Sequence, residues 1–77
     1  MSVKRIYDVV YEEKWTYSPE WIESNLKVLS NGDARSAVEK AKRYSLKQTF
    51  FDDEKNRMER VRKFRLLSVD VEATADI

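Results

Sequence analysis

Hydrophobic and polar residues alternate along the first part of the chain, over residues 3–17. One set of alternate positions carries aromatic and β-branched side chains, namely Tyr7, Val9, Tyr11, Trp15 and Tyr17. Glu13 is the exception within this set. Period-two alternation of such residues is typical of a β-strand with one buried face. The pattern therefore predicts one long strand, whose aromatic face forms the floor of the core.

The apolar spacing changes to a helical period after the chain's single glycine, Gly32. Asn31-Gly32 indicates a turn, and Asp33 is a candidate N-cap because its carboxylate can accept amide protons of the first helical turn. Mostly small residues then recur on one side of the helix, at Ala34, Ala37, Val38, Ala41 and Tyr44. Because alanines allow close approach, we expect a helix over 33–44 that packs on the aromatic face of the strand.

Residues 18–29 are compatible with two structures. In the first, Ser18 is an N-cap and Pro19 opens a helix. Its partly apolar face would hold Trp21, Ile22, Asn25, Leu26 and Leu29. In the second, a loop continues to Ser24 and a short strand covers 26–29, and a helical turn at 19–23 can coexist with it. We favour the second narrowly, because Leu-Lys-Val-Leu leading through Ser-Asn-Gly-Asp into a helix is a common strand-to-helix passage.

A hairpin is expected after the helix. Alternation from Leu46 predicts a strand of about eight residues that ends at Asp52-Asp53. A turn at 53–56 follows, in which Asn56 can take a positive φ. The last strand, 58–73, would approach ~50 Å at ~3.3 Å per residue. We therefore expect it to bend, twist strongly or project as an arm, with a β-bulge near 65–68 where the apolar residues change faces.

These elements predict one small α+β domain over residues 1–77, with an antiparallel sheet of three or four strands and one main helix packed on one face. Such a chain buries only ~60% of its unfolded surface. The chain has no cysteine and no histidine, so disulfides are excluded and a structural zinc site is not expected. Dense packing of its nine aromatic residues or oligomerisation would add stability.

Charge is unevenly distributed around a net value of +1. Residues 1–33 have a net charge of −2, residues 34–65 of +6 and residues 66–77 of −3. This pattern predicts a surface with two signs. The N-terminus lacks the apolar core of a secretory signal, and no apolar run approaches the length of a membrane span. We expect a cytoplasmic protein that does not bind membranes.

Enzymatic chemistry finds little support in the sequence. Without histidine or cysteine, no Ser–His or Cys–His pair can form, and one glycine cannot build a phosphate-binding loop. Asp52-Asp53-Glu54 lacks the spacing of a calcium loop. Nothing distinguishes any pair of carboxylates as an acid–base pair. We therefore expect no catalytic residue, no metal and no cofactor.

Two surfaces are candidates for binding. The first is a basic hairpin beside Phe50, Phe51 and Phe64, with the cations Lys47, Lys55, Arg57, Arg60, Arg62, Lys63 and Arg65. Such a ribbon can contact phosphates and stack bases. The competing interpretation, which we favour, is a solvated hairpin whose charges protect its edge from aggregation.

The second candidate surface is acidic and faces a protein partner. Trp21 would anchor the partner, since Trp is a favoured interface residue, or it would instead close the end of the core. The acidic residues are Glu12, Glu13, Glu20 and Glu23. They could compete with nucleic acid for a basic channel of a nucleoprotein complex.

Several segments resemble small phage and prophage proteins. These are Tyr7-Asp8-Val9-Val10-Tyr11-Glu12-Glu13, Trp15-Thr16-Tyr17, Val28-Leu29-Ser30-Asn31-Gly32-Asp33-Ala34, Phe64-Arg65-Leu66-Leu67-Ser68-Val69 and Ala73-Thr74-Ala75-Asp76-Ile77. The chain resembles anti-CRISPR proteins in the same way. This resemblance implies a non-enzymatic phage-encoded inhibitor. It would occlude a host protein or nucleoprotein complex in the host cytoplasm. The alternatives are nucleic-acid binding by the basic hairpin 47–65 and a structural subunit, such as a homodimer, that assembles through a strand edge.

Overall fold

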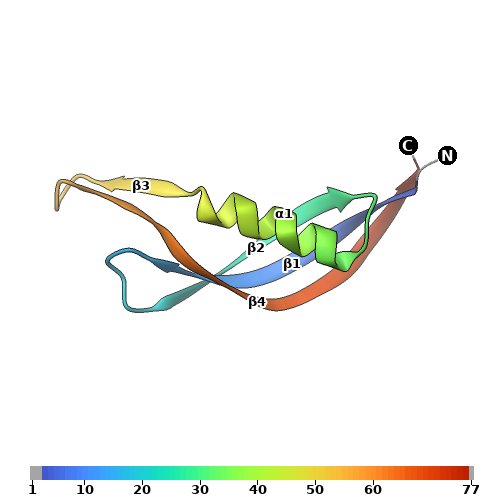
Figure 1. Ribbon diagram of the computed structural model, residues 1–77, viewed down its shortest axis with the longest axis horizontal. Coiled ribbons are helices and arrows are strands. Elements are labelled where there is room, and N and C mark those ends of the chain that lie inside the picture. Colours follow the sequence, from blue (N-terminus) through green and yellow to red (C-terminus); the bar gives the residue numbers. More distant parts are fainter. Residues whose placement is uncertain (1–2, 77) are drawn as a thin grey trace.

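The computed structural model describes residues 3–76, which form four antiparallel strands and one helix. In chain order these are β1 (Val3–Trp15), β2 (Trp21–Ser30), α1 (Ala34–Leu46), β3 (Thr49–Asp52) and β4 (Arg57–Asp76). The strand order in the sheet is β2-β1-β4-β3 (Figure 1). The predicted α+β class, with one main helix and an antiparallel sheet, is therefore confirmed.

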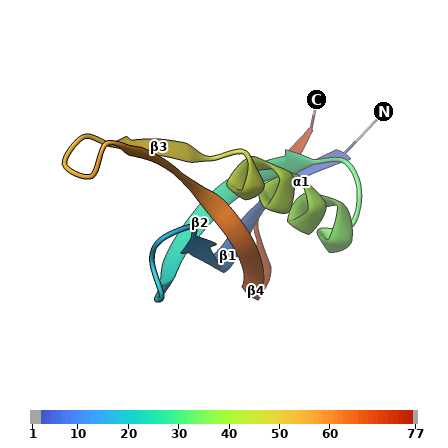
Figure 2. The same cartoon turned by 60° about the vertical axis from the view of Figure 1, so that its left-hand side comes forward.

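Strand β4 changes partners along its length. Residues 57–60 pair with β3, whereas residues 61–76 pair with β1. As a result, residues 49–60 project from the body as a two-stranded hairpin, which we call the arm (Figures 1 and 2). The chain extends 51 Å along its longest axis and has a radius of gyration of 14.7 Å. A compact chain of this length has a radius of gyration of about 11.5 Å. The expected projection of the last strand is confirmed.

The core joins alternate residues of β1 to small residues of α1. Its buried members are Tyr7, Val9, Tyr11, Val28, Ala37 and Ala41. The helix contacts β1, β2 and β4, and both of its core alanines are fully buried. The hydroxyl of Tyr7 also donates to the Gly32 carbonyl at 3.3 Å, which ties the start of the helix to β1.

Two aromatic residues expected in the core are exposed instead. Tyr17 lies outside the core because β1 ends at Trp15 and residues 16 and 17 form a turn. Tyr44 is exposed because the buried positions of the helix recur every four residues, at 37, 41 and 45. Ser45 therefore takes the inward position, and its hydroxyl donates to Oε2 of buried Glu13 at 2.6 Å.

Residues 21–30 form a complete strand, which neither interpretation of this segment anticipated in full. The short strand at 26–29 is confirmed, but the loop or helix expected around Trp21 is wrong. The reason is pairing with β1, which continues in register from Arg5–Ser30 to Lys14–Trp21. A long neighbouring strand supplies hydrogen-bond partners for these residues, although their own apolar alternation is weak.

Local signals at the turns and boundaries are mostly confirmed. The Asp33 carboxylate accepts the Ser36 amide at 3.0 Å as an N-cap, and Asn56 has a φ of 51°. The bulge falls at Leu67, which is the extra residue opposite Val10 and Tyr11, and two further register shifts occur. The helix continues to Leu46, however, so β3 covers only 49–52 and is shorter than expected.

Candidate functional site

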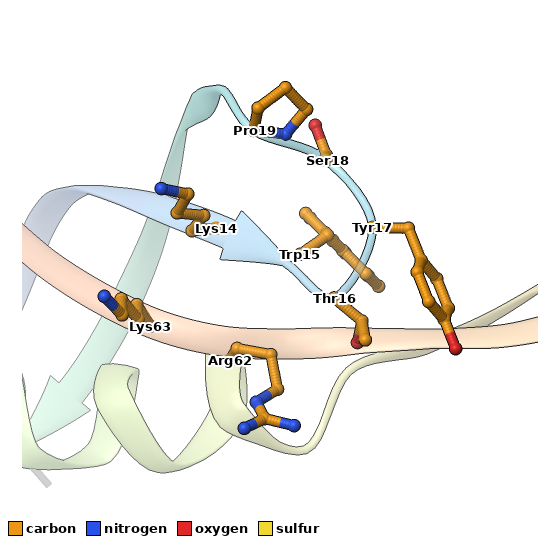
Figure 3. Close-up of a pocket in the computed structure, with 8 residues that line it drawn as sticks. All are labelled: Lys14, Trp15, Thr16, Tyr17, Ser18, Pro19, Arg62 and Lys63. Carbon is orange, nitrogen blue, oxygen red and sulfur yellow. The ribbon is translucent and has the colours of Figure 1, made fainter.

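A cleft of about 710 Å³ opens where β1 runs into its connection with β2 (Figure 3). Three cationic side chains, two aromatic rings, two hydroxyl-bearing residues and a proline line it. They are Lys14, Trp15, Thr16, Tyr17, Ser18, Pro19, Arg62 and Lys63. No acidic side chain belongs to this lining. The cleft therefore has the composition of a site for an anion that also carries a flat or apolar group.

A β-bulge brings two neighbouring cations into this cleft. Lys14 pairs with Lys63, whereas the next residue, Trp15, pairs with Val61. Arg62 is thus the extra residue on β4. In a regular strand Arg62 and Lys63 would point to opposite faces, but a bulge sets two residues against one and re-aims a side chain. Both residues line the cleft, and Figure 3 shows their side chains leaving β4 in different directions.

Backbone and side-chain contacts hold the walls of the cleft. The Thr16 amide donates to the Arg60 carbonyl at 2.9 Å, and the Thr16 hydroxyl lies 2.8 Å from the same oxygen. The Arg60 amide donates in turn to the Thr16 hydroxyl at 3.1 Å. The guanidinium of Arg57 lies 3.8 Å from the centroid of the Tyr17 ring. These contacts fix the loop against β4, so a ligand would meet a preformed surface.

Among the side chains that the structure describes, those of residues 4–73, no carboxylate forms an ion pair with a cation of the cleft. The ion pairs in this range are Lys27 with Glu72 and Arg65 with Glu12. Neither pair includes a cation of the cleft. Lys14 and Lys63 are moreover directly opposite each other in the register, and like charges in such positions repel. A bound anion would reduce this repulsion.

The arm carries a second candidate surface, which is apolar. Phe50 is 58% exposed, Met58 is 56% exposed and Phe51 is 46% exposed. Phe51 pairs with Met58, so these two share one face of the arm, and Phe50 lies on the other face opposite Glu59. The arm thus presents apolar side chains to solvent on both faces.

The four glutamates of the predicted acidic surface do not all lie on the surface of the protein. Arg65 donates through Nε to the Glu12 carboxylate at 2.9 Å, and its guanidinium lies 4.2 Å from the centroid of the Trp21 ring. Trp21 is half-buried, whereas Glu20 and Glu23 are exposed. Glu13 is buried beside α1. Only Glu12, Glu20 and Glu23 of the four predicted acids therefore lie where a partner could reach them.

The seven cations of the predicted basic hairpin do not form one patch. Arg62 and Lys63 line the cleft, Arg57 stacks on Tyr17 and Arg65 is paired with Glu12. The others are at separate places, with Lys47 at the end of α1, Lys55 in the turn of the arm and Arg60 on β4.

Sequence reasoning did not group Lys14, Trp15 and Tyr17 with Arg62 and Lys63. These residues meet because β1 and β4 pair and because β4 bulges at Arg62. A basic residue next to two aromatics and a proline was visible in the sequence. The partner strand and the position of this bulge were not.

In the part of the chain that the structure describes, no group of three or more histidine, cysteine, aspartate or glutamate side chains could hold a metal ion. Among the same residues, no helix has the length and apolar character that crossing a membrane requires. No family model, curated protein or solved structure matches the chain significantly.

Proposed function

We propose that this chain is a non-enzymatic protein-binding module and that the arm is the element that contacts its partner. The observation that carries the proposal is the exposure of Phe50, Phe51 and Met58 on a projecting hairpin. Exposed apolar groups of this kind mark interaction sites, and aromatic side chains are frequent anchors of protein interfaces. Exposed apolar residues that are scattered singly are normal on a protein surface. Here three of them lie within the four residue pairs that join β3 to β4.

The shape of the chain supports a partner for this region. Its accessible surface is 5581 Å², whereas a compact protein of this mass exposes about 5,000 Å². In our proposal α1 covers one face of the sheet, and the arm extends beyond the end of that helix. The arm therefore has no core of its own, and burial of its phenylalanines in a partner would supply one.

The mechanism we propose is steric occlusion. Phe50 or Phe51 would enter an apolar groove of the partner, and the charged residues beside them, such as Lys55 and Arg60, would steer the encounter. The resemblance to small phage proteins implies that the partner is a host protein or a nucleoprotein complex. This identification remains a prediction.

The test compares two double variants that remove equal numbers of exposed apolar side chains. Phe50→Ser with Met58→Ser changes the arm, and Ile22→Ser with Leu29→Ser changes β2, where both residues are also exposed. A partner is captured with the wild-type chain, purified and titrated against all three proteins. Hot-spot residues contribute about 2 kcal/mol or more, so we expect the arm variant to bind at least ~30-fold more weakly. The β2 variant should bind like wild type.

Equal binding by the two double variants would contradict the proposal, as would the absence of any saturable partner. Light scattering of the free chain identifies self-assembly. A mass of 9.2 kDa at high concentration is expected if the partner is a different protein. A doubled mass that the arm variant abolishes would make the partner a second copy, as a structural subunit requires.

A further inference from the structure

We propose that the cleft between residues 14–19 and β4 binds single-stranded nucleic acid. Lys14, Arg62 and Lys63 would contact phosphates, and the ring of Trp15 would stack on an unpaired base. The cleft shares none of its residues with the apolar surface of the arm. The two proposals can therefore fail separately.

The charge of the cleft favours a ligand that contains phosphate. The lining has three cations and no acid, and neither ion pair of the described residues involves any of the three. Lys14 and Lys63 are paired across β1 and β4, where like charges disfavour each other, although the Lys14 ammonium also lies 5.8 Å from the centroid of the Trp21 ring. Figure 3 shows Lys14 and Lys63 extending to one side of the cleft and Arg62 leaving β4 on its other side, so successive phosphates of a phosphodiester backbone would contact them.

The size of the cleft favours more than an inorganic ion. Its volume of about 710 Å³ falls within the range of roughly 300–1,000 Å³ that is typical of small-molecule sites. A single phosphate group would leave most of that space filled with water. A nucleotide unit, with its sugar and base, would occupy it more completely.

The aromatic residues favour an unpaired base. Figure 3 shows Trp15 between the loop and β4, with Lys14 and Lys63 to one side of it and Tyr17 to the other. Arg57 already covers one face of the Tyr17 ring, so Trp15 is the better platform. Stacking of a base on an aromatic ring needs an open base face, which a duplex does not offer along its length. A single strand would offer phosphates to the cations and an unpaired base to the ring of Trp15.

One wall of the cleft is already ordered in the free chain. The loop that forms one wall is fixed by three contacts between Thr16 and Arg60, and the Ser18 amide donates to the Trp15 carbonyl at 3.3 Å. A ligand would not have to order this wall, which reduces the entropic cost of binding.

The first test measures anisotropy of a fluorescently labelled oligodeoxythymidylate across a salt series. Three phosphate contacts predict a slope of about −2 in log K against log salt, so affinity should fall about 20-fold from ~50 to ~200 mM. Arg62→Glu with Lys63→Glu should weaken binding about tenfold or more. The matched control is Arg35→Glu with Lys42→Glu, two exposed helix residues whose reversal changes net charge equally. This control should bind within about threefold of wild type. Circular dichroism checks that each variant is folded, and Lys63→Gln replaces the double reversal if that one is not.

The second test reports on the site itself. The chain has two tryptophans, so Trp21→Phe leaves Trp15 as the only indole. The oligonucleotide should quench the emission of Trp15 with the same midpoint as the anisotropy change. Thymidine monophosphate and a blocked DNA duplex serve as the other ligands, and both should bind more weakly than the single strand.

Four results would overturn the proposal. The first is the absence of saturable binding at low salt, and the second is an equal loss of affinity in the cleft variant and the control variant. The third is binding that leaves the emission of Trp15 unchanged. The fourth is a mononucleotide or duplex that binds as tightly as the single strand. The last result would assign the cleft to free nucleotides or to non-specific charge attraction.

Discussion

One buried hydrogen bond joins α1 to β1, and its removal gives a sharp prediction about stability. The Ser45 hydroxyl donates to Glu13 Oε2 at 2.6 Å. Ser45 is fully buried and Glu13 is 7% exposed. Ser45→Ala deletes only the hydroxyl and keeps the backbone and the helix position. The variant therefore leaves a buried carboxylate oxygen without the donor that the helix supplies.

The expected cost can be estimated from these contacts. A hydrogen bond to a charged group contributes about 1.5–3 kcal/mol to stability. We expect a cost within this range, because the variant leaves the buried Glu13 carboxylate without its hydrogen-bond donor. We expect Ser45→Ala to lower the free energy of unfolding by about 2 kcal/mol. For a domain of this size that is a fall in Tm of about 8–16 °C.

Removing both partners should cost less than the sum of the single changes. Glu13→Leu with Ser45→Ala puts apolar atoms in place of the polar contact, so no buried polar group is left unpaired. We expect this double variant to lie within about 1 kcal/mol of wild type.

Urea unfolding followed by circular dichroism measures these differences, with unchanged m values as the check for two-state behaviour. Ser68→Ala is the matched control, because Ser68 is exposed on β4 and should change stability by less than about 0.5 kcal/mol. The reasoning is refuted if Ser45→Ala behaves like this control or if the effects of the two single changes simply add in the double variant.

Three further predictions concern other contacts. Asp33→Ala removes the acceptor of the Ser36 amide and should lower stability by about 1 kcal/mol in urea unfolding. Asn56 has a φ of 51°, so Asn56→Gly should be nearly neutral, whereas Asn56→Val should cost about 1–2 kcal/mol in the same assay. Burial raises the pKa of the Tyr11 hydroxyl above its usual 10.0, although a hydrogen bond with Ser24 opposes this and the charge of Glu13 adds to it. The folded state then holds this proton more tightly than the unfolded state. This contribution to stability should be complete below pH 10 and lost as the pH rises through the raised pKa. Urea unfolding at a series of pH values measures this loss. Tyr11→Phe has no hydroxyl to ionise, so its stability should fall less over the same pH range.

The sequence predicted those parts of the fold that depend on local pattern. The alternation from Tyr7 to Trp15 predicted β1, and the N-cap Asp33 with Ala37 and Ala41 predicted α1. These signals succeed because a strand face and a helix face are each specified by neighbouring residues. The long last strand was also predicted, and its length, which exceeds the width of a small domain, predicted that it would bend, twist or project.

Features that depend on pairing between distant segments were missed. Strand β2 forms because ten of its residues pair with β1, and no local pattern in the sequence predicts this pairing. The inward turn of Ser45 toward Glu13 similarly depends on how α1 lies against β1. The cleft required both the pairing of Lys14 with Lys63 and the bulge at Arg62, so its residues could not be grouped from their spacing.

Amide hydrogen exchange would show whether the arm binds a protein partner. Exchange would be measured for the free chain and for the chain saturated with its purified partner. We predict slowed exchange in residues 49–60, around Phe50, Phe51 and Met58, and unchanged exchange in β2. Slowed exchange in β2 with unchanged exchange in the arm would contradict the proposal. It would show that the partner binds at β2, the opposite edge strand of the sheet.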